Sequence, residues 1–318
     1  MRLNNDIFGS ITKSKRIAIA GHVRPDGDCV GSCTALHLYL KKQYPDKIID
    51  TYLELIPDSF QFLKDTDKII TNYDEDIIYD LFISLDSGDV DRLGPAEKYF
   101  DTAISTINID HHISNTNFAV INYVMANASS TCETLFDLFD EDIIDQDIAE
   151  ALYLGIVHDT GVFKHSNTTR NTMTIAGKLI EKGFSFSTII DESFFQKTYV
   201  QNQILGRCLL ESIFVLGKKC IVSTVSLKIL DFYGAGPKDL DGVIDQLRVT
   251  KGVEVAILIQ ETASREYKVS LRSNNHVDVS RIAVYFGGGG HIKAAGCSMS
   301  GTIHDVINNL TKHIENQL

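Results

Sequence analysis

The sequence predicts an α/β protein with an N-terminal domain built on a parallel sheet, a smaller C-terminal α+β domain, and a cleft between them. In the first half, short apolar runs alternate with stretches of helical periodicity, which is typical of a parallel sheet covered by helices. Beyond about residue 210, strand-like segments are separated by short helical ones. We therefore expect domains at 1–188 and 216–318, joined by a helical linker at 189–215.

The elements of the first domain follow from two patterns. Strands are expected where short apolar runs end at polar or glycine residues, at 16–21, 48–53, 81–85 and 103–109. Helices are expected where apolar residues recur every three to four positions, at 31–44, 129–139, 148–157 and 171–182. The last of these helices is followed by Gly183, a typical end signal.

The remaining chain shows the same two patterns with shorter helices. The stretch 187–210 is expected to be mostly helical and to contain the connection between the domains. Later strands are expected at 219–226, 253–260 and 267–272, and short helices at 240–247 and 277–286. A glycine run at 287–290 precedes a short strand near Cys297 and a final helix from about Ile303.

Composition and charge limit the function classes. Hydrophobic residues make up 44% and charged residues 23% of the 318 positions, which is ordinary for a globular protein. Lys and Arg total 30 and Asp and Glu total 42, so 30 − 42 gives a net charge of −12, which disfavours binding to long duplex nucleic acid. No apolar run is long enough for a membrane span, the amino end has no apolar signal-peptide core, and the six scattered cysteines suit a reducing cytosol. We expect a cytoplasmic protein that does not bind membranes.

Acidic and histidine side chains follow three of the predicted strands. The first strand leads into His22, Asp26 and Asp28, the third into Asp86, and the fourth into Asp110, His111 and His112. A further acid, Asp159, follows an apolar helix, where a turn can present it inward. Because ligands bind outside the carboxyl ends of strands in open α/β sheets, we expect these side chains to share one edge.

Such a cluster points to divalent cations, although each part also has a plain structural explanation. The sequence PDGD is a good turn, adjacent histidines are common at surfaces, and Asp86 and Asp159 suit helix caps or turns. Together, however, several close carboxylates repel one another unless cations neutralise them. Asp and His without thiolates favour Mn²⁺, Mg²⁺ or Fe²⁺, and six such side chains are enough for two ions.

Four segments, in order, resemble the motifs of the DHH phosphoesterase family: HVRPDGDCVGS, LDSGD, DHH and HDTGVF. The segment SLRS followed by GGGGHIKAAG resembles the DHHA1 domain that accompanies one branch of that family. The resemblance covers essentially the whole chain and is similar to the oligoribonuclease/pAp-phosphatase branch, the NrnA type. That branch also contains relatives that act on cyclic di-AMP and on its linear product pApA.

The resemblance implies two divalent ions, Mn²⁺ before Mg²⁺, with Asp86 as the bridge between them. The other implied ligands are His22 and Asp26 for the first ion, and Asp28, His111 and Asp159 for the second. Asp110 matches an acidic residue that supports this shell, and His112 matches a group that faces the phosphate. Lys164 and His165 follow the last motif without an implied role.

In the second domain the resemblance implies a nucleotide site. Arg272 would pair with a terminal phosphate, and His291 would hold the nucleotide near the metals. Gly288, Gly289 and Gly290 would let the backbone approach an anion, although a glycine run by itself fits a flexible loop equally well.

The implied function is a metal-dependent phosphodiesterase that releases 5′-mononucleotides from short oligoribonucleotides (nanoRNA, pApA) and removes the 3′-phosphate from pAp. Three alternatives stay open: hydrolysis of cyclic di-AMP, a manganese-dependent inorganic pyrophosphatase, and a nucleotide-binding sensor without catalysis. The implied partners are therefore short nucleotides, and the sequence leaves open whether the chain forms a homodimer.

Overall fold

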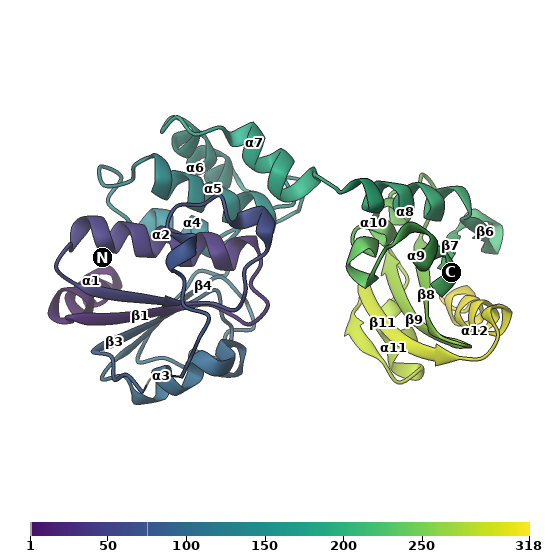
Figure 1. Cartoon of the computed structure of the whole chain (residues 1–318), viewed down its shortest axis with the longest axis horizontal. Coiled ribbons are helices and arrows are strands. Elements are labelled where there is room, and N and C mark those ends of the chain that lie inside the picture. Colours follow the sequence, from purple (N-terminus) through teal and green to yellow (C-terminus); the bar gives the residue numbers. More distant parts are fainter. Residues whose placement is uncertain (1, 75) are drawn as a thin grey trace. The chain divides into compact units, whose positions relative to one another are not determined.

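The computed structural model describes residues 2–74 and 76–318 and divides the chain into two compact units (Figure 1). The first unit extends to Gln196, and the second runs from Lys197 to Leu318. The first contains a parallel sheet and the second a mixed sheet, which confirms the predicted α/β and α+β classes.

The first unit is built on a five-stranded sheet of order β2–β1–β3–β4–β5. Its strands are β1 (Arg16–Ala20), β2 (Ile48–Tyr52), β3 (Leu81–Leu85), β4 (Thr106–Asp110) and β5 (Ile121–Val124). All neighbouring pairs are parallel, so the carboxyl ends of the strands meet at one edge of the sheet. The edge strand β5 was not predicted, because its sequence INYV is half polar and only partly buried.

Helices cover both faces of this sheet. Its helices are α1 (Arg2–Lys13), α2 (Gly27–Gln43), α3 (Glu97–Thr102), α4 (Thr131–Leu138), α5 (Gln146–Asp159), α6 (Arg170–Ile180) and α7 (Phe186–Ile190). Figure 1 shows α3 on the opposite side of the sheet from α2 and α4. In β1, Ile17 and Ile19 pack into the core under α2 and α5, while Ala18 and Ala20 pack with Tyr99 of α3. Both faces are buried, which explains the continuous apolar runs in the sequence.

Three boundaries in the first unit differ from the predicted ones in ways that matter for the site. Helix α2 begins at Gly27 instead of residue 31, because the Asp26 side chain caps it by accepting from the backbone N–H groups of Asp28 and Cys29. Strand β4 reaches Asp110, one residue later than predicted. Helix α5 extends to Asp159, which is therefore the last helical residue and not part of the following turn.

The second unit is built on a mixed sheet of order β10–β11–β9–β8–β7–β6. Its strands are β6 (Ile213–Val215), β7 (Cys220–Val225), β8 (Val255–Ala263), β9 (Glu266–Ser273), β10 (Gly289–His291) and β11 (Ala294–Ser300). Its helices are α8 (Tyr199–Leu210), α9 (Leu227–Tyr233), α10 (Val243–Arg248), α11 (Val279–Tyr285) and α12 (Ile303–Glu315). One face packs against α11 and α12, and the other against α8, α9 and α10. Helix α8 lies inside the predicted linker, yet its Ile204 and Cys208 are buried in the core of this unit.

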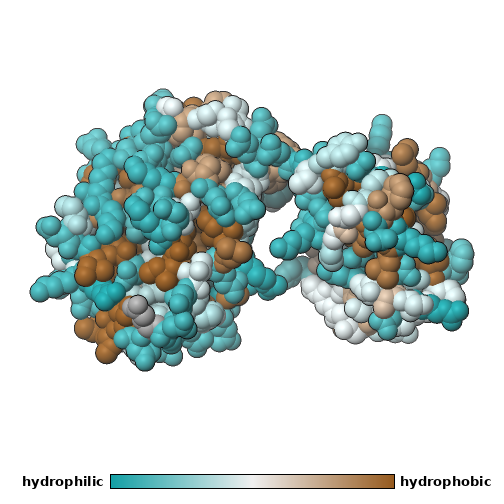
Figure 2. Space-filling view, in the orientation of Figure 1, coloured by the Kyte–Doolittle hydropathy of each residue, from teal (hydrophilic) through white to brown (hydrophobic). Residues whose placement is uncertain are grey.

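Hydrophilic side chains cover much of the visible surface of each unit, and exposed hydrophobic ones form small separate groups (Figure 2). Within residues 2–74 and 76–318, no helix has both the length and the apolar character that crossing a membrane requires.

Candidate functional site

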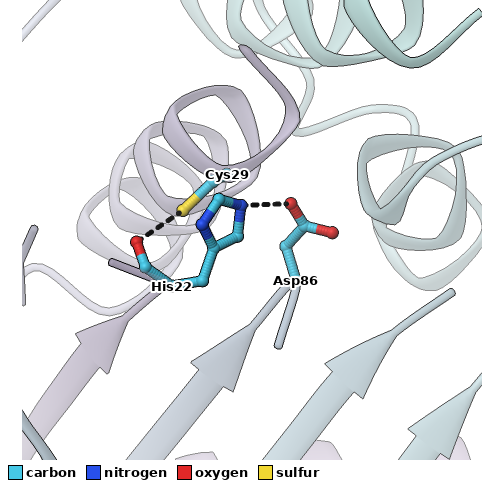
Figure 3. A group of neighbouring side chains, drawn as sticks. All are labelled: His22, Cys29 and Asp86. Atoms are coloured by element: carbon cyan, nitrogen blue, oxygen red, sulfur yellow. Dashed lines mark hydrogen bonds and ion pairs between the residues drawn. The ribbon is translucent and has the colours of Figure 1, made fainter. Parts of the chain in front are cut away.

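His22 and its two acidic neighbours lie at the carboxyl end of β1. Nδ1 of His22 lies 2.9 Å from the carbonyl oxygen of Val23, so a proton on Nδ1 is held there and Nε2 points toward the acids. Nε2 lies 3.4 Å from Asp86 and 3.7 Å from Asp26. Figure 3 shows the His22 ring directed at Asp86. The backbone of Asp86 has a positive φ of 54°, a conformation that Asp adopts more readily than most residues.

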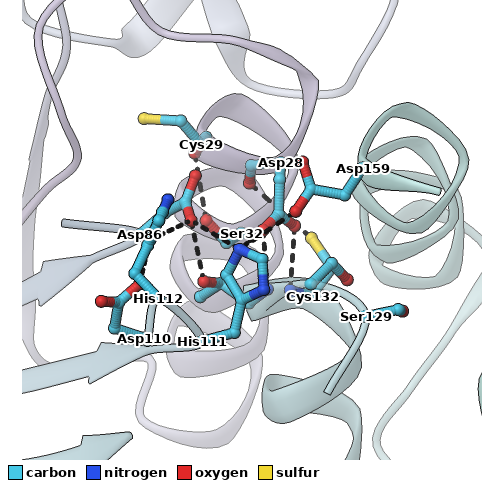
Figure 4. A network of polar contacts seen from close by, with 12 residues as sticks. Asp28, Cys29, Ser32, Asp86, Asp110, His111, His112, Ser129, Cys132 and Asp159 are labelled. Atoms are coloured by element: carbon cyan, nitrogen blue, oxygen red, sulfur yellow. Dashed lines mark hydrogen bonds and ion pairs between the residues drawn. The ribbon is translucent and has the colours of Figure 1, made fainter. Parts of the chain in front are cut away.

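The segment after β4 supplies the second half of the cluster (Figure 4). Nε2 of His111 lies 3.0 Å from Asp159, 3.6 Å from Asp86 and 4.0 Å from Asp28. Asp28 is fully buried in the first turn of α2, and Asp159 comes from the end of α5. Four separate elements therefore deliver ligand atoms to one place.

Asp110 and His112 form a pair beside this cluster. Nδ1 of His112 donates to Asp110 at 2.7 Å, and Nδ2 of Asn115 donates to the other Asp110 oxygen at 2.6 Å. Asp110 is fully buried, whereas the His112 side chain is 44% exposed. The pair thus holds Nδ1 of His112 in place and leaves the far side of the ring accessible.

Among the described residues, three groups of side chains have ligand atoms within 4.8 Å of one another, close enough to hold a metal ion. They are His22 with Cys29 and Asp86; Asp86 with His111 and His112; and Asp28 with His111 and Asp159. Asp86 and His111 each belong to two groups, so the groups overlap. Asp26, the remaining sequence-predicted ligand, contacts the cluster through His22.

Cys29 lies against the cluster but is a poor ligand. Its Sγ lies 3.8 Å from the carbonyl oxygen of His22, to which the thiol donates. Burial raises the pKa of Cys29 well above its usual value, so the sulfur stays protonated. The donor set is therefore imidazole nitrogen and carboxylate oxygen, which suits Mn²⁺, Mg²⁺ or Fe²⁺ and differs from a cysteine-rich structural zinc site.

The electrostatics of the cluster favour bound cations. Burial and the carboxylates of Asp86 and Asp159 raise the pKa of Asp28 well above its usual range. Burial lowers the pKa of His111, but contacts with Asp159, Asp28 and Asp86 outweigh it and raise the pKa to about 10. Neighbouring carboxylates similarly raise the pKa of His22 to about 11 against the effect of burial. Without a metal ion, protons on these side chains offset the negative charge of the carboxylates. A bound divalent ion would offset that charge in place of the protons.

The start of α4 supports the cluster, although the sequence predicted no role for these residues. The backbone N–H groups of Thr131 and Cys132 donate to Asp28 at 2.6 and 3.0 Å. The Thr131 hydroxyl donates to Asp86 at 3.0 Å. Free N–H groups at a helix start are suited to a carboxylate. Ser130 caps this helix by accepting from the backbone N–H of Glu133, and the Ser-x-x-Glu spacing is a signal that could have marked the helix start.

The segment after Asp159 makes a left-handed turn, with positive φ at Gly161, Val162 and Phe163. Nδ1 of His165 lies 3.2 Å from the Asp159 carbonyl oxygen. The sequence predicted no role for His165. This contact shows that its ring lies against the end of α5. The Lys164 side chain is exposed.

The predicted substrate-binding residues all lie in the second unit. His291 pairs with Ala294 across β10 and β11, and Ala294 pairs with Arg272 across β11 and β9, so the register places His291 and Arg272 in one row. Nε of Arg272 lies 3.7 Å from Asp245.

The glycine run has a packing role that the sequence did not reveal. The N–H of Gly288 donates to the Ala283 carbonyl, and Gly289 and Gly290 belong to β10. A Cβ on Gly288 would lie 2.1 Å from the Gly296 carbonyl oxygen, so this position requires glycine for close packing.

Comparisons with known proteins identify the family. The model of the DHH family N-terminal domain matches residues 16–156, and the model of the DHHA1 domain matches residues 217–318. The chain therefore carries a DHH domain followed by a DHHA1 domain. The DHH match includes five of the six predicted ligands and ends three residues before Asp159.

Curated relatives of this DHH chain include proteins named bifunctional oligoribonuclease and PAP phosphatase NrnA. The one from Thermus thermophilus is 28% identical over 294 residues, 90% of this chain and 84% of the relative. The one from Bacillus subtilis is 26% identical over 302 residues, 93% of each protein. The crystal structure of an exopolyphosphatase-related protein from Bacteroides fragilis shares the fold, with a TM-score of 0.87, 23% identity, and coverage of 99% of this chain and 96% of that one.

Proposed function

We propose that this DHH-family chain is a phosphodiesterase that hydrolyses short oligoribonucleotides, including pApA, to 5′-mononucleotides and removes the 3′-phosphate from pAp. The observation that carries this proposal is the overlap of ligand groups through Asp86 and His111 at the carboxyl edge of the parallel sheet. The names of the relatives, oligoribonuclease and PAP phosphatase, support this choice of substrates.

The proposed cofactors are two divalent ions, Mn²⁺ before Mg²⁺, with Asp86 between them. His22 and Asp26 would complete the first site, and Asp28, His111 and Asp159 the second. Bound ions supply Lewis-acid stabilisation of the phosphate and a nucleophile at neutral pH. Asp28 and Asp86 would keep their orientation through the N–H groups and hydroxyl at the start of α4.

In this proposal His112 is the general acid that protonates the leaving oxygen. Asp110 holds the Nδ1 proton of His112, so Nε2 is the ring nitrogen free to face a substrate. The hydrogen bond with Asp110 outweighs burial and raises the pKa of His112, which favours a protonated ring near neutral pH. Nε2 can then donate its proton to the leaving oxygen.

The proposed division of labour follows the predicted domains. Residues 1–188 would hold the metals, 189–215 would connect the two domains, and 216–318 would bind the nucleotide. Arg272 would contact a terminal phosphate and His291 the nucleotide, with Gly288, Gly289 and Gly290 lining the approach. All six cysteines are free and buried, which supports a cytoplasmic location.

The test is turnover by the full chain, with Mn²⁺ or with EDTA, on pAp, pApA, a short RNA, cyclic di-AMP and pyrophosphate. In the presence of Mn²⁺ we expect the chain to release AMP from pAp and pApA and mononucleotides from RNA. In EDTA we expect none of these products. Asp86→Asn, which keeps the size and tolerates the positive φ, should abolish these products.

Other outcomes separate the alternatives. Faster loss of intact cyclic di-AMP than of pApA would replace the proposal with a cyclic-dinucleotide phosphodiesterase. Phosphate from pyrophosphate alone would indicate a pyrophosphatase, against which the DHHA1 match argues. Nucleotide binding without any product, unchanged by Asp86→Asn, would indicate a sensor.

A further inference from the structure

A pocket of about 560 Å³ lies on the second sheet, next to the glycine run. Three strands and the glycine run line it, and its polar side chains are those of Thr262, Lys268, Ser270 and Ser298. The glycines are among the predicted substrate-binding residues, whereas the sequence predicted no role for Lys268 or for the hydroxyl groups around it.

The register explains why the polar side chains gather on one face. Lys268 pairs directly with Ser298, and Ser270 with Gly296, so these residues point to the same side of β9 and β11. The intervening residues Val269 and Cys297 are buried in the core on the other side. The pocket therefore presents a lysine flanked by hydroxyl groups and bare glycine backbone.

The pocket carries a positive charge, whereas the chain as a whole is acidic. Lys268 is its only charged lining residue, in a protein with a net charge of −12. Lysines elsewhere, such as Lys42 and Lys178, pair with carboxylates at 2.8 and 2.6 Å. Among the residues that the structure describes, the Lys268 ammonium group has no hydrogen-bonding or ion-pairing partner, and the residue is exposed. An exposed, unpaired ammonium beside hydroxyl groups favours an anionic ligand.

Lys268 also lies on the same face of β9 as Arg272, four residues away, which corresponds to about 13 Å along the strand. Both phosphates of pAp belong to one nucleoside, whereas a pentaribonucleotide carries further backbone phosphates that can extend along β9 from Arg272 toward Lys268.

We infer that Lys268, with Ser270 and Ser298, binds a backbone phosphate of an oligoribonucleotide whose terminal phosphate lies at Arg272. This inference rests on the proposed function and deepens it, because it makes Lys268 a determinant of preference for longer substrates. The site contacts phosphate and not base edges, so it selects length and not sequence.

The experiment compares KM for a pentaribonucleotide with KM for pAp in the wild type, Lys268→Ala, Lys268→Arg and Lys251→Ala. Lys251 is an exposed lysine outside the pocket and serves as the matched control. Lys268→Ala should raise the ratio of the two KM values about threefold to fivefold, the size of one exposed charge contact. Lys268→Arg should restore the ratio, and Lys251→Ala should leave it unchanged.

Salt dependence provides a second measurement. The slope of log affinity against log salt for the pentaribonucleotide should become shallower by about 0.7 in Lys268→Ala, the value for one phosphate contact on a single strand. An unchanged KM ratio or slope, or an equal effect of Lys251→Ala, would overturn the inference.

A binding assay separates this inference from the proposed function. Fluorescence anisotropy of a labelled pentaribonucleotide and of labelled pAp gives the same ratio without turnover. A Lys268-dependent ratio in a chain that hydrolyses neither substrate would support the phosphate site while overturning the proposed function. Turnover of both substrates with a ratio independent of Lys268 would do the reverse.

Discussion

The hydroxyl of Thr131 offers a direct test of how the cluster is supported. It donates to Asp86 at 3.0 Å, and Thr131 is completely buried. Thr131→Val replaces the hydroxyl with a methyl group of similar size and keeps the backbone N–H that donates to Asp28. The substitution therefore removes a single hydrogen bond to a buried carboxylate.

The expected cost follows from that contact. A hydrogen bond to a charged group contributes about 1.5–3 kcal/mol, and its loss leaves an Asp86 oxygen without this donor. His111 and His112 lie 3.6 and 3.7 Å from the same oxygen and can compensate in part. We expect the free energy of unfolding of the metal-free protein to fall by about 1.5–3 kcal/mol. Since Asp86 loses a group that orients it, Mn²⁺-dependent turnover should fall about 10- to 100-fold.

The chain has no tryptophan, so urea unfolding in EDTA is best followed by circular dichroism. Thr131→Ser keeps the hydroxyl and is the matched control. A change below about 0.5 kcal/mol for Thr131→Val would refute this reasoning, since surface-like substitutions give changes of that size. Equal losses for Thr131→Val and Thr131→Ser would point to packing and not to the hydrogen bond.

Two further predictions concern Asp110 and the glycine run. Burial raises the pKa of Asp110, but hydrogen bonds from His112 and Asn115 bring it below 3.8, while the hydrogen bond with Asp110 raises the pKa of His112 above 6.5. The Asp110 contribution to stability is present above pH 3.8 and lost as pH falls through its folded pKa, and that of His112 is present below pH 6.5 and lost as pH rises through its folded pKa. Asp110→Asn should therefore lower the thermal unfolding midpoint most between pH 3.8 and pH 6.5, where both contributions are present. A decrease in the midpoint that is constant from pH 4 to 9 would contradict this. Gly288→Ala should destabilise the second unit by about 1–3 kcal/mol, because its Cβ would meet backbone, whereas Gly289→Ala has nothing within 4 Å and should cost little in the same urea titration.

The fold was predictable where burial dictates the pattern. Strand β3 has the predicted bounds because LFISL is buried at every position and ends at polar residues. Strand β5 and the short strand β10 were missed because neither has such a run: one is half polar, and the other consists of two glycines and His291. Their pairing depends on neighbouring strands and not on local propensity.

The cluster was predictable to the extent that it follows strand ends, because the topology of a parallel sheet brings these ends together. The support from α4 was not predictable in this way. Thr131 and Asp28 are 103 residues apart, and their contact depends on how α4 packs against α2. The spacing of Ser130 and Glu133 is typical of a helix start, but nothing local shows that the free N–H groups of this helix face a carboxylate.

The imidazoles of the cluster lead to a last prediction about metal binding. The pKa of His22 is raised to about 11 and that of His111 to about 10, so both rings are protonated at pH 7 in the metal-free protein. A metal ligand must be unprotonated, and Mn²⁺ binding should therefore release about two protons from these rings. Calorimetric titration in two buffers of different ionisation enthalpy measures this release, and His22→Gln or His111→Gln should each reduce it by about one proton. Equal heats in both buffers would mean that the ion binds elsewhere, because no ion can occupy Nε2 of either ring without displacing its proton.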